Sequence, residues 1–190
     1  VAELHTRLLK EQELHDWYEL YPEKFNNKTN GITQRRWLLS ANEELSEFIT
    51  KRIGHGWEKD LTKLKGLEKF TNDKDLNELI AIKEHNKRRL ADYLKHAQNE
   101  IIDADSIFDV QVKRLHEYKR QLMNILHIMY VYNNMLEDPN YKPAKKTYIF
   151  GAKSASGYRR AKSIIKLINT VAERINNDRR VNDRLHVVFV

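Results

Sequence analysis

A run of eight residues concentrates positive charge: Lys113-Arg114-Leu115-His116-Glu117-Tyr118-Lys119-Arg120. It contains four positive charges and one negative, with a histidine and a tyrosine between them. The run lies where a β-rich stretch gives way to helical spacing, and a helix N-terminus favours anions through its unpaired N–H groups and its dipole. The guanidinium fork of Arg114 can bind two phosphate oxygens, and the lysines can act as point charges. The pattern therefore predicts a phosphate site, and the alternative is a solvated basic helix start.

A second segment is suited to close approach by a ligand: Gly151-Ala152-Lys153-Ser154-Ala155-Ser156-Gly157-Tyr158. Its small residues let the backbone come near a bound molecule. It is not a Walker loop, and it lacks the Gly-x-Gly-x-x-Gly of dinucleotide folds. By itself it is a weak signal, and the alternative is an ordinary small-residue turn between a strand and a helix.

Five short elements must position these two segments. Their order is strand, helix, strand, helix, strand, which is typical of an open, parallel, doubly wound α/β sheet. Ligands of such sheets bind beyond the carboxyl ends of the strands, where both segments fall. The predicted strands are 107–112, 147–150 and 185–190, and the helices between them carry Leu122, Ile125, Leu126 and Met129, then Ala161, Ile164, Ile165, Ile168, Val171 and Ile175.

Residues 1–10 and 31–105 are predicted to be mainly helical, whereas 11–30 are aromatic and polar. Ser40 and Glu43 have the spacing of a capping box, and Gly54 is a suitable stop for the helix that follows. A second helix is predicted from about 73 to 96, with one apolar and one charged face. The turn-forming residues 26–31 are the best candidate for a domain boundary. The apolar face of the second helix consists of Leu76, Leu79, Ile80, Leu90, Tyr93 and Leu94.

Composition excludes several classes of protein. The 190 residues include 34 Lys+Arg, 27 Asp+Glu and no Cys, which gives a formal net charge of +7. The lack of cysteine excludes a disulfide scaffold and a thiolate metal site, and no histidine spacing indicates another metal site. No apolar run approaches the roughly 20 residues of a membrane helix, so no membrane partner is expected. A basic module that binds nucleic acid remains an alternative, although the acidic residues are interspersed and no binding motif is present.

Four segments resemble the α-glucan phosphorylases, the family of glycogen, starch and maltodextrin phosphorylases. The most specific covers 108–122 (FDVQVKRLHEYKRQL), which resembles the family signature FDVQVKRIHEYKRQLLN. Residues 28–38 (KTNGITQRRWL) resemble KTNGITPRRWL, and 151–158 (GAKSASGY) resemble GGKAAPGY. Residues 181–190 resemble the family strand V-x-DRL-x-V-x-F. The resemblance therefore runs through essentially the whole chain in order.

The resemblance implies two Rossmann-like domains that face each other across a cleft, the glycosyltransferase-B architecture. Residues 1–30 would be the C-terminal tail of the first, glucan-binding domain. Residues 31–190 would open the second domain, which binds pyridoxal 5′-phosphate, with 31–105 mainly helical and 106–190 carrying the βαβαβ pattern. The implied enzyme is a cytoplasmic, homodimeric hexosyltransferase, allosterically controlled in animals. It cleaves terminal α-1,4-glucosyl units with inorganic phosphate and releases α-D-glucose 1-phosphate, with no nucleic-acid partner.

The same resemblance implies a catalytic group of three cations. Arg114 would bind the substrate phosphate and stabilise charge as the glucosidic bond breaks. Lys119 would hold phosphate shared between cofactor and substrate, and Lys113 would lie beside the cofactor phosphate, which relays a proton to the substrate phosphate. Trp37 would pack against the cofactor region, with a plain core tryptophan as the alternative.

Three further residues are implied to contact the substrate. Asn30 would hydrogen-bond glucose in the cleft, and Tyr118 would touch the sugar or its phosphate with its hydroxyl. His116 would lie near the glucose site, with a structural role as the alternative.

Some positions depart from the family pattern. Gln34 and Ser156 replace prolines, and Phe150 stands where a small residue is common. The chain begins with Val1 and closes on a strand, so it is expected to be an internal fragment, inactive by itself. The lysine that carries the cofactor is expected to lie downstream of it. Another glycosyltransferase-B enzyme, using a sugar nucleotide, remains an alternative.

Overall fold

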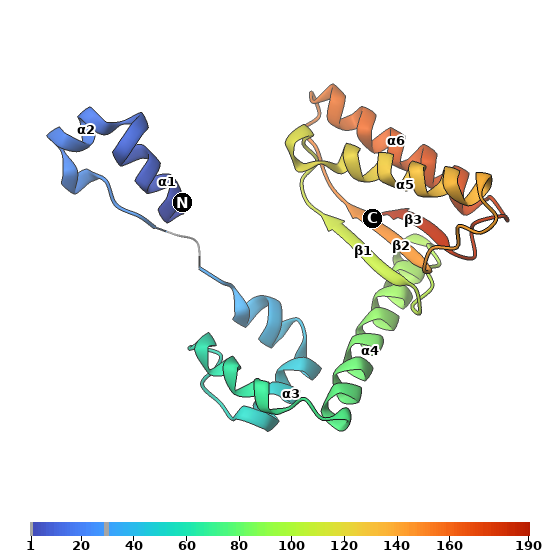
Figure 1. The fold of residues 1–190 in the computed structure, drawn as a ribbon, viewed down its shortest axis with the longest axis horizontal. Coiled ribbons are helices and arrows are strands. Elements are labelled where there is room, and N and C mark those ends of the chain that lie inside the picture. The colour runs from blue at the N-terminus through green and yellow to red at the C-terminus, as the bar shows by residue number, and fades with distance from the viewer. Residues whose placement is uncertain (1, 29–30) are drawn as a thin grey trace. The chain divides into compact units, whose positions relative to one another are not determined.

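A computed structural model describes residues 2–28 and 31–190 (Figure 1). The chain divides into two compact units, of which the first ends at Leu79 and the second spans Ile80–Val190. Within the described residues, no helix combines the length and the apolar character needed to cross a membrane. The assignment of residues 1–30 to one domain and of 31–190 to the next was made for the full-length protein. It stays a prediction.

The second unit contains the predicted βαβαβ pattern. Its strands are β1 (Ile107–Val112), β2 (Lys146–Gly151) and β3 (Leu185–Phe189), which pair in parallel in the order β1-β2-β3. The register aligns Val110 with Ile149 and Ile149 with Val188. The two crossover helices are α5 (Gln121–Glu137) and α6 (Arg159–Asn176). The predicted α/β fold, with a parallel sheet preceded by a helical segment, is therefore confirmed.

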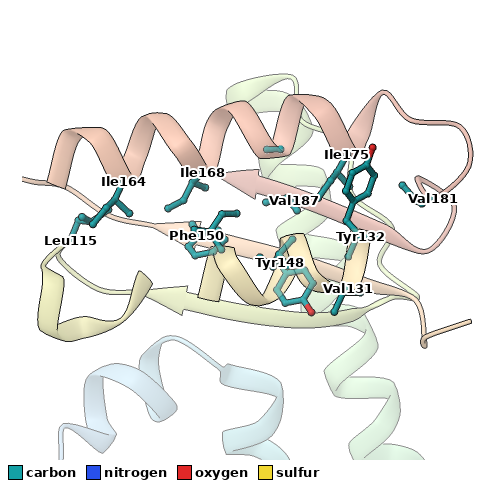
Figure 2. Packing of buried hydrophobic residues seen from close by; sticks show 14 of the residues in the cluster. Leu115, Val131, Tyr132, Tyr148, Phe150, Ile164, Ile168, Ile175, Val181 and Val187 are labelled. Carbon is teal, nitrogen blue, oxygen red and sulfur yellow. The ribbon is translucent and has the colours of Figure 1, made fainter. Parts of the chain in front are cut away.

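Alternating side chains of the sheet enter two separate cores. Tyr148, Phe150 and Val187 point to the face covered by α5 and α6, where they join the main apolar cluster (Figure 2). Ile149 and Val188 point to the other face and pack with Leu94 and Ile102, which come from the segment before β1. Burial on both faces explains why β2 reads as a continuous apolar run.

The helical spacing of α6 predicts its buried face correctly. Ala161, Ile164, Ile168 and Ile175 are all buried in the main cluster, while the rest of the helix is mostly polar. The predicted face of α5 is only partly right, because Ile125 is fully buried whereas its neighbours in the pattern are not. The exposed members of that predicted face are Leu122 and Leu126.

The remaining elements are helical, as predicted for residues 1–10 and 31–105, and helical turns also occupy residues within 11–30, where no helix was predicted. Three of them are α3 (Glu43–Ile53), the 3₁₀ segment η4 (Leu61–Lys69) and α4 (Asp73–Gln98). Of these, α4 alone has residues in both units. The others, in order, are α1 (Glu3–Leu8), the π-helical η1 (Leu9–Glu13), α2 (His15–Leu20), the 3₁₀ turn η2 (Pro22–Lys24) and the π-helical η3 (Arg35–Ser40).

Two details of the predicted helices are wrong. The cap of α3 is Asn42, whose Oδ1 accepts a hydrogen bond from the N–H of Leu45 at 3.4 Å, whereas Ser40 ends η3. Since α3 begins at Glu43, that residue is too early in the helix to complete a capping box with Ser40. Gly54 ends α3 as predicted, with a positive φ of 76°. On α4, much of the predicted apolar face is exposed, namely Leu76, Ile80 and Tyr93.

A charge network joins α3 to the start of α4. The guanidinium of Arg52 donates from Nε to Oδ1 of Asp75 at 2.8 Å and from Nη2 to Oε2 of Glu78 at 2.7 Å. Asn72 also donates to Asp75, at 2.6 Å, and the guanidinium carbon lies 3.4 Å from the ring centroid of Phe48. The hydrogen bonds from Arg52 are the main reason that the pKa values of both carboxyls lie below their ordinary ones.

This network predicts acid-sensitive stability. Asp75 and Glu78 have ordinary pKa values of 3.8 and 4.5, and folding lowers both. Their contribution is therefore complete above these ordinary values and is lost as the pH falls through the lower folded values. Urea titrations of the chain between about pH 6 and pH 3 should show the unfolding free energy falling more steeply for the wild type than for Arg52→Met. Equal slopes would contradict the prediction.

Candidate functional site

The basic run of the sequence forms the loop that leaves the carboxyl end of β1. The loop contains a single 3₁₀ turn, η5 (Glu117–Lys119), before α5 begins. Leu115 is 3% exposed and belongs to the main core cluster, whereas Lys113 and Arg114 on its N-terminal side are exposed. The loop is thus anchored by an apolar side chain and presents its cations to solvent.

Backbone hydrogen bonds carry the parallel pairing beyond the strands. The N–H of Lys113 donates to the carbonyl of Gly151 at 3.0 Å, and the N–H of Leu115 donates to the carbonyl of Lys153 at 3.1 Å. The two segments that the sequence singled out therefore lie side by side at the carboxyl edge of the sheet. A Cβ on Gly151 would come within 3.1 Å of Cγ2 of Val112, so the close approach leaves little room for a larger residue.

Side chains link the same two segments. Glu117 accepts hydrogen bonds from the Tyr158 hydroxyl and from Nη1 of Arg160, each at 2.7 Å. The bond from Tyr158 is the main reason that the pKa of Glu117 is lowered, and the bond from Arg160 adds to it. The same bond raises the pKa of Tyr158. The one acidic residue of the basic run is therefore bound by two residues outside it.

The cations of the run are not paired in this way. Within residues 2–28 and 31–190, the structure gives no carboxylate partner to Lys113, Arg114 or Lys119. The Lys119 ammonium instead lies 5.6 Å from the ring centroid of Tyr118. Unpaired cations gathered on one loop attract anions, and a helix N-terminus follows directly.

His116 and Tyr118 have different environments. Nδ1 of His116 accepts from the N–H of Tyr118 at 3.4 Å and so caps η5. Its ring centroid lies 4.1 Å from that of Tyr118 and 5.3 Å from that of Tyr158. Tyr118 is 71% exposed, which leaves its hydroxyl accessible to a ligand. Arg120 then adopts a left-handed φ of 64° and turns the chain into α5.

Sequence reasoning missed three carboxamide side chains beneath the loop. Nε2 of Gln121 donates to the carbonyls of Lys113 and Arg114, at 3.3 and 3.2 Å. Nε2 of Gln111 donates to the carbonyl of Lys119 at 3.1 Å, and Asn124 donates to Oε1 of Gln111 at 2.9 Å. A signal was present, because Gln121 shares the helical spacing of the buried residues Ile125 and Ile128, and a buried amide must find partners.

Two predicted site residues are not brought to the loop by the second unit itself, because Trp37 is in the first unit and Asn30 is not described. Trp37 belongs to the first unit and is 73% exposed, with the Arg36 guanidinium carbon 5.9 Å from its ring centroid. The core-tryptophan alternative is therefore wrong for this chain, and its predicted contact with a cofactor stays a prediction. Asn30 lies outside the described residues.

A groove lies away from the cationic loop, at the end of the sheet where the segment after α6 leads into β3. Its volume is about 540 Å³, and it adjoins the C-terminal end of α6. Two of the arginines that line it already have partners in the chain, since Arg180 pairs with Asp178 at 2.6 Å and Arg174 donates to the Tyr132 hydroxyl at 3.2 Å. Parallel α/β sheets bind ligands at the carboxyl edge, so volume alone does not make this groove the candidate site.

These features define a parallel α/β protein with a cationic loop at the carboxyl edge of its sheet. The family model for carbohydrate phosphorylases matches residues 1–190. The chain therefore belongs to the carbohydrate phosphorylase family.

Several relatives are identical to this chain at nearly half of the aligned positions. The glycogen phosphorylase of Synechocystis sp. is 49% identical over 191 residues, which cover 100% of this chain and 22% of the relative. The glycogen phosphorylase of Bacillus subtilis is 48% identical, with 100% and 24% covered. The liver form of human glycogen phosphorylase is 46% identical, with 100% and 23% covered. The chain thus spans about a quarter of the length of these relatives.

Proposed function

We propose that the full-length protein containing this chain is an α-1,4-glucan phosphorylase. It would cleave the terminal glucosyl unit of a glucan with inorganic phosphate and release α-D-glucose 1-phosphate. The observation that carries the proposal is the loop with Lys113, Arg114 and Lys119 unpaired at the carboxyl edge of the sheet. The relatives named glycogen phosphorylase support the choice of reaction.

The three cations have distinct roles in this proposal. Arg114 binds the substrate phosphate through its planar fork and stabilises the charge that develops as the bond breaks. Lys119 and Lys113 hold phosphate beside it as point charges. Two phosphate groups repel each other at short range, so they can lie together only where several cations offset that repulsion.

The loop also fits the phosphate group of pyridoxal 5′-phosphate. Lys113 and Lys119 supply the cationic donors that such a group needs, and Trp37 is the third residue that we assign to the cofactor. When bound, the cofactor supplies a second phosphate group that exchanges a proton with the substrate phosphate. None of the lysines of this chain is assigned to the covalent attachment of the cofactor, and Lys153 in particular is not.

The sugar contacts complete the assignment. The exposed hydroxyl of Tyr118 touches glucose or its phosphate, Asn30 hydrogen-bonds glucose, and His116 shapes the loop around both. The proposed enzyme is a cytoplasmic homodimer that acts on glycogen, starch or maltodextrin.

The test is phosphorolysis by the full-length protein. Maltodextrin and inorganic phosphate are supplied, and glucose 1-phosphate is measured before and after removal and restoration of pyridoxal phosphate. We expect product that depends on both phosphate and cofactor. A folded, cofactor-loaded protein that forms no product, but releases sugar from a nucleotide donor, would establish the alternative glycosyltransferase. Steeply salt-dependent binding to nucleic acid, without either activity, would establish a basic binding module.

The isolated chain is expected to form no glucose 1-phosphate. It spans about a quarter of its relatives' length, and we assign the attachment of the cofactor to a lysine outside it. The same assay with the 190-residue chain and added cofactor measures this directly. Phosphate-dependent product at any rate above a blank would contradict the expectation.

A further inference from the structure

Four hydrogen bonds hold the backbone of the cationic loop around Arg114. The N–H groups of the residues on either side of it, Lys113 and Leu115, donate to the carbonyls of Gly151, the last residue of β2, and of Lys153, which follows that strand. The carbonyls of Lys113 and Arg114 both accept from Nε2 of Gln121. The backbone is thus held from two sides, by the neighbouring loop and by the first residue of α5.

Gln121 is unusual among the polar residues of this region. It is 1% exposed, although it lies at the start of a helix beside a solvated loop. Its Oε1 is enclosed and has no hydrogen-bond partner among the described residues. The reverse orientation of the amide would place Oε1 against two carbonyl oxygens, so only the amino group can face the loop.

We propose that Gln121 is the positioning residue of the phosphate-binding loop, which its buried carboxamide holds by the carbonyls of Lys113 and Arg114. It touches no substrate and acts through the cations that it places. This inference rests on the proposed phosphorolysis and deepens it. The chemical reason is that an anion site is effective only when its charges are fixed before the ligand arrives.

The matched residue for comparison is Asn176, at the end of α6. Its carboxamide also makes two backbone hydrogen bonds, donating to the carbonyl of Val187 at 2.8 Å and accepting from its N–H at 3.0 Å. Asn176 thus joins α6 to β3, and both elements follow the cationic loop by more than 30 residues in the sequence. Asn176→Leu and Gln121→Met each remove one carboxamide that bridges two backbone groups. If the role of Gln121 were purely structural, both variants would lose stability and neither would change the KM for phosphate selectively.

The experiment measures initial rates of phosphorolysis by the full-length, cofactor-loaded protein at varied phosphate and varied maltodextrin. For Gln121→Met we expect the KM for phosphate to rise by about tenfold or more, with the KM for maltodextrin unchanged, because small misplacements of catalytic groups are costly. Asn176→Leu should lower the Tm without this change. Equal phosphate KM values for Gln121→Met and wild type, or proportional changes in both KM values, would overturn the proposal.

Two additions keep the test decisive. If Gln121→Met does not fold, Gln121→Asn replaces it, because the shorter side chain cannot reach both carbonyls, and the same outcomes apply. If the wild type forms no glucose 1-phosphate, the proposed function fails and the rise in Tm caused by inorganic phosphate is measured instead. A rise in the wild type that is lost in the Gln121 variant supports the positioning role. A rise of equal size in both, or none in the wild type, overturns it.

Discussion

Replacing Arg114 with alanine in the full-length protein is expected to lower kcat for phosphorolysis by about 10²–10³-fold, the range found when one group that stabilises transition-state charge is removed. Arg114 is exposed on a loop whose backbone is held on both sides, and the structure pairs it with no carboxylate among the described residues. Its charge is therefore available to a phosphate at little cost in reorganisation. The measurement is the initial rate with saturating maltodextrin and phosphate.

Two further variants separate charge from geometry. Arg114→Lys keeps the positive charge and loses the planar fork, so its rate should lie between those of the wild type and the alanine variant. Arg179→Ala removes another exposed arginine, from the loop between α6 and β3, and should leave the rate unchanged. A rate near that of the wild type for Arg114→Ala would falsify the assignment of this residue to the reacting phosphate.

Truncation of Phe150 to alanine is expected to lower the free energy of unfolding of the chain by about 3–5 kcal/mol. Phe150 is 1% exposed on β2, the central strand, and its side chain belongs to the main cluster between the sheet and its two helices (Figure 2). The cost combines the lost burial of the ring with the cavity left behind. Urea denaturation of the 190-residue chain, followed by circular dichroism, measures it.

Two comparisons show whether the loss arises from packing. Phe150→Leu retains most of the apolar volume and should cost clearly less than the alanine variant. Leu126→Ala removes a similar apolar group that is 51% exposed on α5, so its effect should stay within about 0.5 kcal/mol. A cost for Phe150→Ala as small as that of Leu126→Ala would contradict the packing account.

Phe150 also shows how a departure from a family pattern can be understood. The resemblance implies a small residue at this position, and the sequence has phenylalanine. The structure places the ring in the core near the end of β2, so a large apolar side chain is accommodated at this position. The neighbouring Gly151 keeps the close approach to β1, because a Cβ there would meet Val112.

Local patterns were sufficient for the elements and for the place of the basic loop. The strands and helices of the second unit follow from apolar periodicity, and the rule for parallel sheets places the loop after β1 beside the segment after β2. The backbone hydrogen bonds from Lys113 and Leu115 confirm that juxtaposition. The family resemblance depended only on the identity and order of residues, and it is confirmed over the whole chain.

Partners distant in the chain could not be predicted in this way. Glu117 pairs with Tyr158 and Arg160, which are 41 and 43 residues further along. Periodicity indicates which residues share a face of a helix, but not whether another element covers that face. This is why Leu76 and Ile80 are exposed on α4 despite their regular spacing.

The sequence by itself determined the family, the parallel α/β order of the second unit and the cations that we assign to phosphate. Those features depend on residue types and on interactions between near neighbours. Only the tertiary structure decided how the cations are held, because the orientation of Gln121 depends on carbonyls that the folded loop brings together. It also decided that Glu117 pairs outside the basic run, with Arg160, rather than with Lys113, Arg114 or Lys119, which no local pattern records.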